Sequence, residues 1–329
     1  MAESGGIFLR AKHRTFSGLD EDAERHWTGP FCFIQAADPQ FGLMKAWRDG
    51  DCDGGGDEWA EEVELTKQAV DAVNQLRPRP RFMVLCGDLV HAMPDTPFRE
   101  GQERDLKAAL EGTDPSIPLV FVSGNHDLGN TPTPSTVEQY CSAWGDDYFS
   151  FWVGGVLCLV LNSQLYYDAS ACPQLKEAQE TWLEEQLSKA TSSTETKPKH
   201  ILVFQHIPLY LKSPDEEDNY FNLQRGVRLN LLDKFKKAGV GGDANESWRI
   251  QSFPDVRVPP LLAAGPLTRA SHLGSRDPAT GPSIPVPCPL GLQPVRQTGR
   301  AGGDKRSSLV RQAGACFDDS SIQWGQKCV

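Results

Sequence analysis

Residues 117–127 read IPLVFVSGNHD, a short apolar run that ends in a glycine and three polar residues. The apolar part predicts a β-strand buried on both faces, as in the central strands of α/β sheets. A turn after this strand would explain Gly124 and Asn125. It does not require His126 and Asp127, so these two residues indicate a chemical role at the strand end.

The same pattern occurs twice before this strand. Residues 31–40, FCFIQAADPQ, and residues 81–88, RFMVLCGD, are apolar runs that reach Asp38 and Asp88. A helix is predicted from about residue 57 to the RPRP segment at 77–80, and another over residues 103–110. The alternation of strands and helices favours parallel strands with right-handed crossovers.

The segments that follow predict a mixed architecture. In residues 147–164, Gly154 and Gly155 separate two β-rich runs, which is typical of a hairpin. An amphipathic helix is predicted over residues 175–187, and a strand over HILVFQHIPL at 200–209, which contains His206. A last helix is predicted over residues 226–238, with Gly239 as its stop. The fold class is therefore α/β with mixed sheets.

Composition divides the chain into three parts. Residues 1–29 are polar and show no period, so we expect a loosely held N-terminal arm, and residues 30–240 carry the regular α/β pattern. Residues 241–329 hold 10 of the 24 prolines and 11 of the 30 glycines, and ten basic against seven acidic residues. Such a segment buries too little apolar surface to offset its ordering entropy, so we expect a disordered tail.

Charge and cysteine content restrict the class of protein. The 329 residues contain 33 Lys plus Arg and 44 Asp plus Glu, a formal charge of −11, which argues against nucleic-acid binding. The apolar runs are too short for a membrane helix, and no signal peptide is apparent. Nine cysteines without a regular spacing favour free thiols in a reducing cytoplasm.

Polar residues at four predicted strand ends form the candidate site: Asp38 with Gln40, Asp88, Asn125 with His126 and Asp127, and His206. The carboxyl ends of strands in an open α/β sheet face one crevice, so these side chains should converge. Carboxylate, amide and imidazole groups together suit divalent cations such as Mn, Fe, Zn or Mg. Two ions bridged by one carboxylate would orient a phosphate, which predicts phosphoester hydrolysis.

Each of these residues alone also has a structural explanation. An Asp before Pro or after Gly is common in turns, and His206 alone would fit a core or loop histidine. Their occurrence at successive strand ends favours the chemical interpretation over chance turns.

The motifs ADPQ, CGDLVH, SGNHD and FQHIP resemble the calcineurin-like metallophosphoesterase family over about residues 30–240. Longer segments, among them LCGDLVHAMP at 85–94 and VSGNHDLGNTPT at 122–133, resemble cytosolic serine/threonine protein phosphatases of that family. The resemblance implies a four-layer αββα sandwich with a site for two divalent metal ions. It also implies hydrolysis of phosphoserine and phosphothreonine in proteins, a signalling kinase being one possible substrate, by attack of a metal-bound hydroxide.

Carried over residue by residue, the resemblance implies that Asp38 binds the first metal and that Asp88 bridges both. Asn125 and His206 would bind the second metal. Gln40 stands where most of the family has a histidine, and an amide oxygen there would favour harder ions such as Mn or Mg over Zn.

The resemblance also assigns residues beside the metals. His126 would act on the leaving-group oxygen, and Asp127 would orient the imidazole of His126. His91 ends the CGDLVH motif and would either line the site or have an outer structural role.

One departure from the family pattern concerns its last motif, Gly-His-x-His, which binds both metals. After residue 240 this chain reads GGDANESW, and His272 is the one histidine that remains. We therefore expect the sandwich to be incomplete at its C-terminal end and each metal to lose one nitrogen ligand. The abrupt change at residue 240, from a regular α/β pattern to a segment rich in proline and glycine, suggests a splice variant or a gene-model error. Two alternatives stay open: a nucleotide phosphodiesterase or pyrophosphatase of the same family, and a catalytically impaired chain that acts as a binding or decoy module.

Overall fold

The computed structural model describes residues 8–51, 56–192, 197–239 and 323–328. The helices are α1 (Glu21–Glu24), α2 (Leu43–Asp49), α3 (Ala60–Gln75), α4 (Arg99–Leu110), α5 (Asn125–Leu128), α6 (Pro134–Trp144), α7 (Ser163–Tyr167), α8 (Pro173–Ser192) and α9 (Arg225–Lys237). The strands are β1 (Cys32–Ala37), β2 (Met83–Cys86), β3 (Leu119–Val122), β4 (Phe149–Val153), β5 (Val156–Val160), β6 (His200–Phe204) and β7 (Gln323–Cys328).

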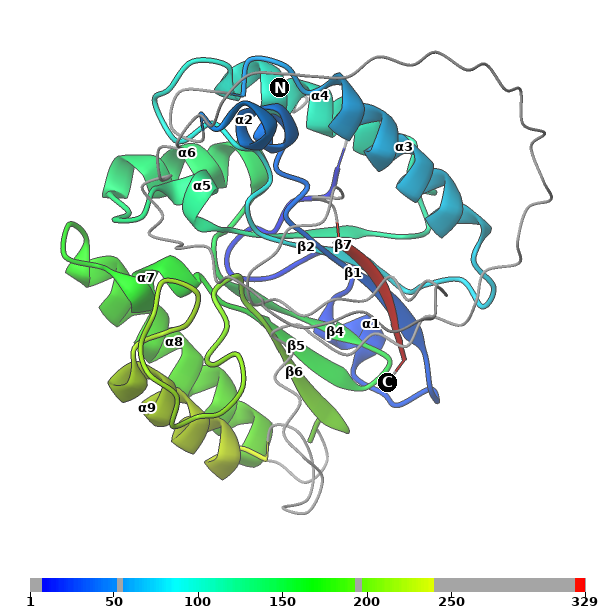
Figure 1. The fold of residues 1–329 in the computed structure, drawn as a ribbon. Coiled ribbons are helices and arrows are strands. Elements are labelled where there is room, and N and C mark those ends of the chain that lie inside the picture. The colour runs from blue at the N-terminus through cyan, green and yellow to red at the C-terminus, as the bar shows by residue number, and fades with distance from the viewer. Residues whose placement is uncertain (1–7, 52–55, 193–196, 240–322, 329) are drawn as a thin grey trace, which may run out of the picture.

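Two sheets pack face to face (Figure 1). The first has the order β3-β2-β1-β7, with β1, β2 and β3 parallel and β7 antiparallel to β1. The second has the order β4-β5-β6, where β4 and β5 form the predicted hairpin and β6 runs parallel to β5. The expected mixed sheets are confirmed.

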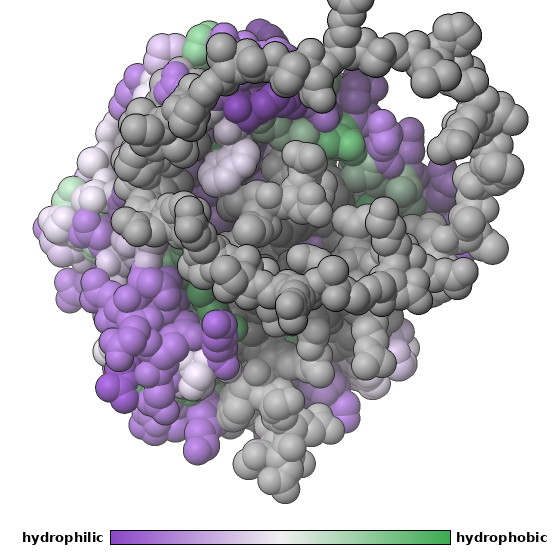
Figure 2. Space-filling model, in the orientation of Figure 1, coloured by the Kyte–Doolittle hydropathy of each residue, from purple (hydrophilic) through white to green (hydrophobic). Residues whose placement is uncertain are grey.

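Three layers of apolar side chains hold the four structural layers together. Between the sheets lies a cluster that includes Phe33, Phe82 and Phe151. On the outer face of the first sheet, residues of α3, α4 and α6 form a second cluster, and on the outer face of the second sheet α8 and α9 form a third. The order is therefore helix, sheet, sheet, helix, as the family resemblance implies (Figure 1). The face that carries α8 and α9 is mainly hydrophilic towards solvent (Figure 2).

The N-terminal segment differs from the expectation of a loosely held arm. Phe16 and Leu19 are buried in the cluster between the sheets. Their segment runs along β4, where the backbone amides of Ser150 and Trp152 donate to the carbonyl oxygens of Arg14 and Leu19 at 3.1 Å each. This segment covers the outer edge of β4, which would otherwise present unpaired backbone groups. The sequence lacked a signal for this packing because the buried residues are isolated among polar ones.

The C-terminal segment also differs in part from the expectation of a disordered tail. Residues 323–328 form β7, which pairs with the whole length of β1. The expectation is wrong for these six residues, and residues 240–322 and 329 lie outside the described part of the chain. Among the described residues, no helix combines the length and apolar character needed to span a membrane.

Candidate metal centre

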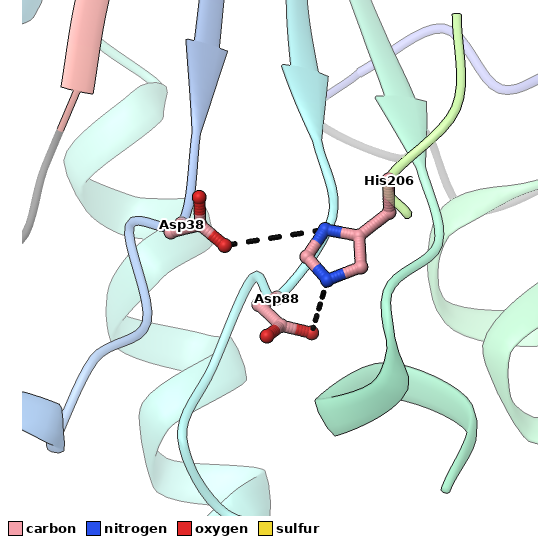
Figure 3. A group of neighbouring side chains, drawn as sticks. All are labelled: Asp38, Asp88 and His206. Carbon is pink, nitrogen blue, oxygen red and sulfur yellow. Dashed lines mark ion pairs between the residues drawn. The ribbon is translucent and has the colours of Figure 1, made fainter. Parts of the chain in front are cut away.

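Asp38, Asp88 and His206 meet at one edge of the sandwich (Figure 3). Asp38 follows β1, Asp88 follows β2 and His206 follows β6, so three strand ends supply the group. His206 Nε2 lies 3.5 Å from Asp88 Oδ1, and His206 Nδ1 lies 3.9 Å from Asp38 Oδ1. One ligand atom from each residue lies within 4.8 Å of the others. The convergence that the sequence predicted for these three residues is present.

Asn125, at the first position of α5, joins this group. Its Oδ1 lies 3.2 Å from His206 Nε2, and the side chain is buried. We therefore define the metal-centre cluster as Asp38, Asp88, Asn125 and His206. Its oxygen and nitrogen atoms come from both sheets, because β6 belongs to the second sheet and the other residues follow strands of the first.

The backbone at the carboxyl ends of β1 and β2 has an uncommon conformation. Asp38, Gln40 and Asp88 have φ values of 52°, 37° and 49°, in the left-handed region that non-glycine residues rarely enter. Two hydrogen bonds hold the turns together: Asp38 N donates to the Gly87 carbonyl oxygen at 3.2 Å, and Gln40 N to that of Asp88 at 3.1 Å. Strained backbone of this kind persists where the surrounding structure fixes it, often at functional sites.

Two glycines allow the strand ends to approach each other. A Cβ atom at Gly124 would overlap the backbone nitrogen and carboxylate of Asp88. A Cβ atom at Gly87, where φ is +82°, would overlap the His206 ring. The glycines of the CGDLVH and SGNHD motifs are therefore required by close packing around the metal-centre cluster, in addition to any role in turns.

The His206 ring is held by its backbone contact. Nδ1 lies 3.0 Å from the carbonyl oxygen of Cys86, which has no hydrogen to give, so Nδ1 carries the proton of this bond. That contact directs Nε2 towards Asp88 and Asn125. A metal-binding histidine usually donates one ring N–H to a carbonyl or carboxylate and binds the metal with its other nitrogen, which here would be Nε2.

The charges of the cluster favour a cation. Burial raises the pKa of Asp38 to about 7, an effect that His206 opposes and Asp88 strengthens. Burial alone would lower the pKa of His206, but the carboxylates of Asp88 and Asp38 raise it to about 9. Protons bound to Asp38 and His206 therefore offset the negative charge of the neighbouring carboxylates. A divalent cation would supply the same compensation, and the two carboxylates, amide oxygen and imidazole nitrogen are suitable ligands for it.

His126 lies beside the cluster, and its position is well defined. Its backbone amide donates to Asp88 Oδ1 at 2.9 Å, and its ring Nδ1 lies 2.5 Å from the carbonyl oxygen of His91. The rings of His126 and His91 stack with centroids 5.1 Å apart. His91 is thus placed against His126, which accords with a role in lining the site.

The structure corrects the expected role of Asp127. The resemblance implied that its carboxylate orients the His126 imidazole, but both Asp127 oxygens accept hydrogen bonds from backbone amides. Oδ1 accepts from Leu89 at 3.1 Å and Oδ2 from Gly124 at 2.7 Å. Asp127 therefore ties together the turns after β2 and β3, and the His91 carbonyl orients His126. Burial, with the neighbouring Asp88 charge, raises the pKa of Asp127 to about 7.

Two residues near the centre were missed as site residues by sequence reasoning. Arg99, the first residue of α4, donates to the carbonyl oxygens of Ala92, His126 and Asp127 at 3.0, 2.8 and 2.9 Å. Tyr220 accepts a hydrogen bond from Asn125 Nδ2 at 3.3 Å. Arg99 stands at the polar start of a helix, where an arginine does not indicate a contact with the site. Tyr220 lies in the SPDEEDNYFNL loop at 213–223, whose acidic composition is typical of a solvated surface.

Gln40 is buried and its backbone lies beside Asp88, but its role as a metal ligand stays a prediction. The sequence has no Gly-His-x-His motif, and His272 lies outside the described residues.

Known proteins resemble this chain over 73% of its length. A family model described as Calcineurin-like phosphoesterase matches residues 33–237. The zebrafish (Danio rerio) serine/threonine-protein phosphatase CPPED1 is 70% identical over 240 residues, which are 73% of this chain and 77% of the relative. The human (Homo sapiens) protein of the same name is 60% identical over 240 residues, 73% and 76% of the two chains. Among solved structures, a purple acid phosphatase from yellow lupin (Lupinus luteus) seeds has a TM-score of 0.42 at 13% identity, covering 69% of this chain and 38% of its own.

Proposed function

The chain belongs to the calcineurin-like phosphoesterase family, and from this premise we propose that it hydrolyses phosphoserine and phosphothreonine monoesters in proteins. The domain is that of a phosphatase enzyme, and relatives at 60–70% identity bear the name serine/threonine-protein phosphatase. The observation that carries the proposal is the convergence of Asp38, Asp88 and His206, from three strand ends, within 4.8 Å.

The metal-centre cluster is the proposed ligand set. The family uses divalent metal ions, which when bound supply positive charge to the phosphate and make water a stronger nucleophile. We assign Asp38 and Gln40 to one ion, Asn125 and His206 to a second, and Asp88 to both. The central place of Asp88 supports this assignment, because its carboxylate lies near His206 Nε2 and also accepts from the His126 amide.

His126 is the proposed proton donor to the leaving-group oxygen. Its Nδ1 must carry a proton because it faces the His91 carbonyl oxygen, so Nε2 is the atom that is available to the substrate. A proton on Nε2 would pass to the alkoxide of serine or threonine as the ester bond breaks. The stacked His91 ring and the bond from the backbone amide to Asp88 keep this imidazole beside the cluster.

The proposed setting is the cytoplasm, with phosphoproteins as substrates. Five cysteines, Cys32, Cys86, Cys141, Cys158 and Cys172, are free thiols, which supports a reducing compartment. A signalling kinase as the natural substrate, and the identity of the metals among Mn, Fe, Zn and Mg, stay predictions.

Phosphate release tests the proposal. The chain is incubated with Mn²⁺ and, in separate reactions, phosphoserine peptides, phosphothreonine peptides and nucleoside diphosphates, with Asp88→Asn as the matched control. We expect the peptides to be hydrolysed and Asp88→Asn to lower kcat/KM by at least about a hundredfold, because the substitution weakens both metal positions. Faster turnover of the nucleoside diphosphates than of the peptides would show a nucleotide hydrolase instead. No turnover of peptides or nucleotides would favour the binding-module alternative.

A further inference from the structure

The loop between β6 and α9 brings an aromatic edge to the metal-centre cluster. Tyr220 and Phe221 are 40% and 42% exposed, unusually high fractions for large rings in the described residues. Their ring centroids are 5.2 Å apart, and the Tyr220 ring lies 6.5 Å from that of Tyr167 at the end of α7. The Tyr220 hydroxyl reaches Asn125 of the cluster. An exposed tyrosine is thus positioned where a substrate would approach.

The loop that carries Tyr220 is held by a dense set of polar contacts. Both carboxylate oxygens of Glu216 accept from the loop: Oε1 from Leu211 N at 2.6 Å, and Oε2 from Lys212 N at 2.7 Å and Ser213 N at 3.2 Å. Asn222 Nδ2 adds a bond of 2.8 Å to Glu216 Oε1. These bonds fix the turns on both sides of Tyr220 although the loop contains no helix or strand.

A buried arginine in α9 contacts the same loop. The Arg228 side chain is fully buried and donates to the carbonyl oxygens of Glu216 and Leu223. It also pairs with the Asp218 carboxylate at 3.3 Å. Both Nη atoms of the buried guanidinium bond to the loop, while its Nε has no partner. Because burying a guanidinium is unfavourable unless it is paired, the loop conformation is what keeps Arg228 paired in the core. Tyr220 is therefore held in place by more than its own surface contacts.

The Asn125 amide determines the direction of the Tyr220 hydroxyl. Asn125 Oδ1 faces His206 in the cluster, and Nδ2 faces the Tyr220 oxygen, which accepts. The reverse orientation would point the positive amide hydrogens at the cation position, which a metal would oppose. Since the Tyr220 oxygen accepts from Asn125, its own hydrogen is left to point elsewhere.

We propose that Tyr220 donates its hydroxyl hydrogen to a phosphoryl oxygen of the bound substrate while it holds the Asn125 amide with Oδ1 towards the metal. The inference rests on the proposed phosphatase function, because it requires a phosphate at the metal-centre cluster. Tyr220 is then a substrate-binding residue of the phosphoryl group and a positioning residue for Asn125. Both roles use the hydroxyl, so they are removed together by Tyr220→Phe, which keeps the ring and its packing.

The test measures binding of inorganic phosphate to the Mn²⁺-loaded full-length chain by calorimetry, together with kcat and KM on a phosphoserine peptide. The variants are Tyr220→Phe and, as the matched control, Tyr167→Phe, which removes a hydroxyl from the neighbouring ring. We expect Tyr220→Phe to weaken phosphate binding by about tenfold or more and to lower kcat/KM by a similar factor, because a hydrogen bond to a charged oxygen is lost. Tyr167→Phe should stay within about twofold of the unchanged chain.

Three results would overturn the proposal. One is phosphate affinity of Tyr220→Phe within twofold of the unchanged chain, and another is an equal loss in Tyr167→Phe. The third is a loss in Tyr220→Phe that excess Mn²⁺ fully restores, since the hydroxyl would then act on the metal alone. Calorimetry keeps this inference separate from the proposed function. A chain that binds phosphate through Tyr220 but cleaves no phosphopeptide would refute the function and leave the role of Tyr220 intact.

Discussion

Arg99→Met should destabilise the turn that carries His126. The Arg99 guanidinium donates to the carbonyl oxygens of Ala92, His126 and Asp127 at 2.8–3.0 Å, and its Nε pairs with Glu103 at 3.0 Å. The side chain is only 12% exposed. Methionine fills similar space but donates none of these bonds, so three carbonyl oxygens lose a charged donor. The Glu103 carboxylate loses its closer ionic partner and keeps Lys107 at 4.0 Å.

The size of the effect follows from these contacts. Three bonds from a charged donor, together with the cost of leaving their acceptors and one mostly buried carboxylate without it, add to about 4 kcal/mol of lost unfolding free energy. Activity should fall as well, because a displacement of His126 by about 1 Å is enough to lower kcat by about a hundredfold. Glu103→Gln is the matched control. It weakens the ion pair but keeps the three carbonyl bonds, so we expect a loss of about 1 kcal/mol or less.

Urea denaturation of the metal-loaded chain, followed by circular dichroism, measures the stability difference, and phosphopeptide hydrolysis measures kcat. The explanation is refuted if Arg99→Met unfolds within about 1 kcal/mol of the unchanged chain and keeps its kcat. It is also refuted if Glu103→Gln is as destabilising as Arg99→Met, because the ion pair would then account for the effect and the carbonyl bonds would not.

Three further predictions concern the metal-centre cluster. The pKa values of Asp38 and Asp127 are raised to about 7 in the folded chain, so the metal-free chain should lose stability as pH rises from 4 to 7. Saturating Mn²⁺ should reduce that loss. Urea midpoints at pH 5, 6 and 7, with EDTA and with Mn²⁺, measure the loss and its reduction. A urea midpoint of the metal-free chain that does not change between pH 5 and 7 would contradict this prediction. Gly124→Ala places a methyl group against Asp88 and should weaken Mn²⁺ binding by at least about tenfold, measured by calorimetry; unaltered affinity would show that the close approach is unimportant. His126→Ala should lower kcat by about a hundredfold while metal content stays near that of the unchanged chain, and a metal-free variant would argue against its place beside the metals.

The central strands and the cluster residues were predictable from sequence because apolar runs and their polar ends carry the information locally. Asp38, Asp88 and His206 each follow a run of β-forming residues, and parallel strands place such ends together. The helix α6 was missed, although Thr133 caps it, Pro134 begins it, and Val137, Tyr140 and Trp144 give it a buried apolar face. The N-terminal segment was missed because Phe16 and Leu19 are buried without any regular period around them.

Side-chain directions were beyond sequence reasoning. Asp127 stands next to His126 in the chain, yet its carboxylate turns to the backbone of Leu89 and Gly124. Arg99 and Tyr220 reach the site from 27 and 95 positions away along the chain, and nothing in their local pattern indicates these contacts. Such interactions depend on how the layers pack, which sequence periodicity does not specify.

The most direct test is the metal content of the purified chain. After loading with Mn²⁺ and removal of free ions, inductively coupled plasma mass spectrometry gives the number of ions per chain, for the unchanged protein and for Asp88→Asn. We predict close to two bound ions for the unchanged chain and a clear loss of metal in Asp88→Asn, because Asp88 is assigned to both ions. No bound metal, or equal metal in both proteins, would contradict the assignment of Asp38, Asp88, Asn125 and His206 as a metal centre.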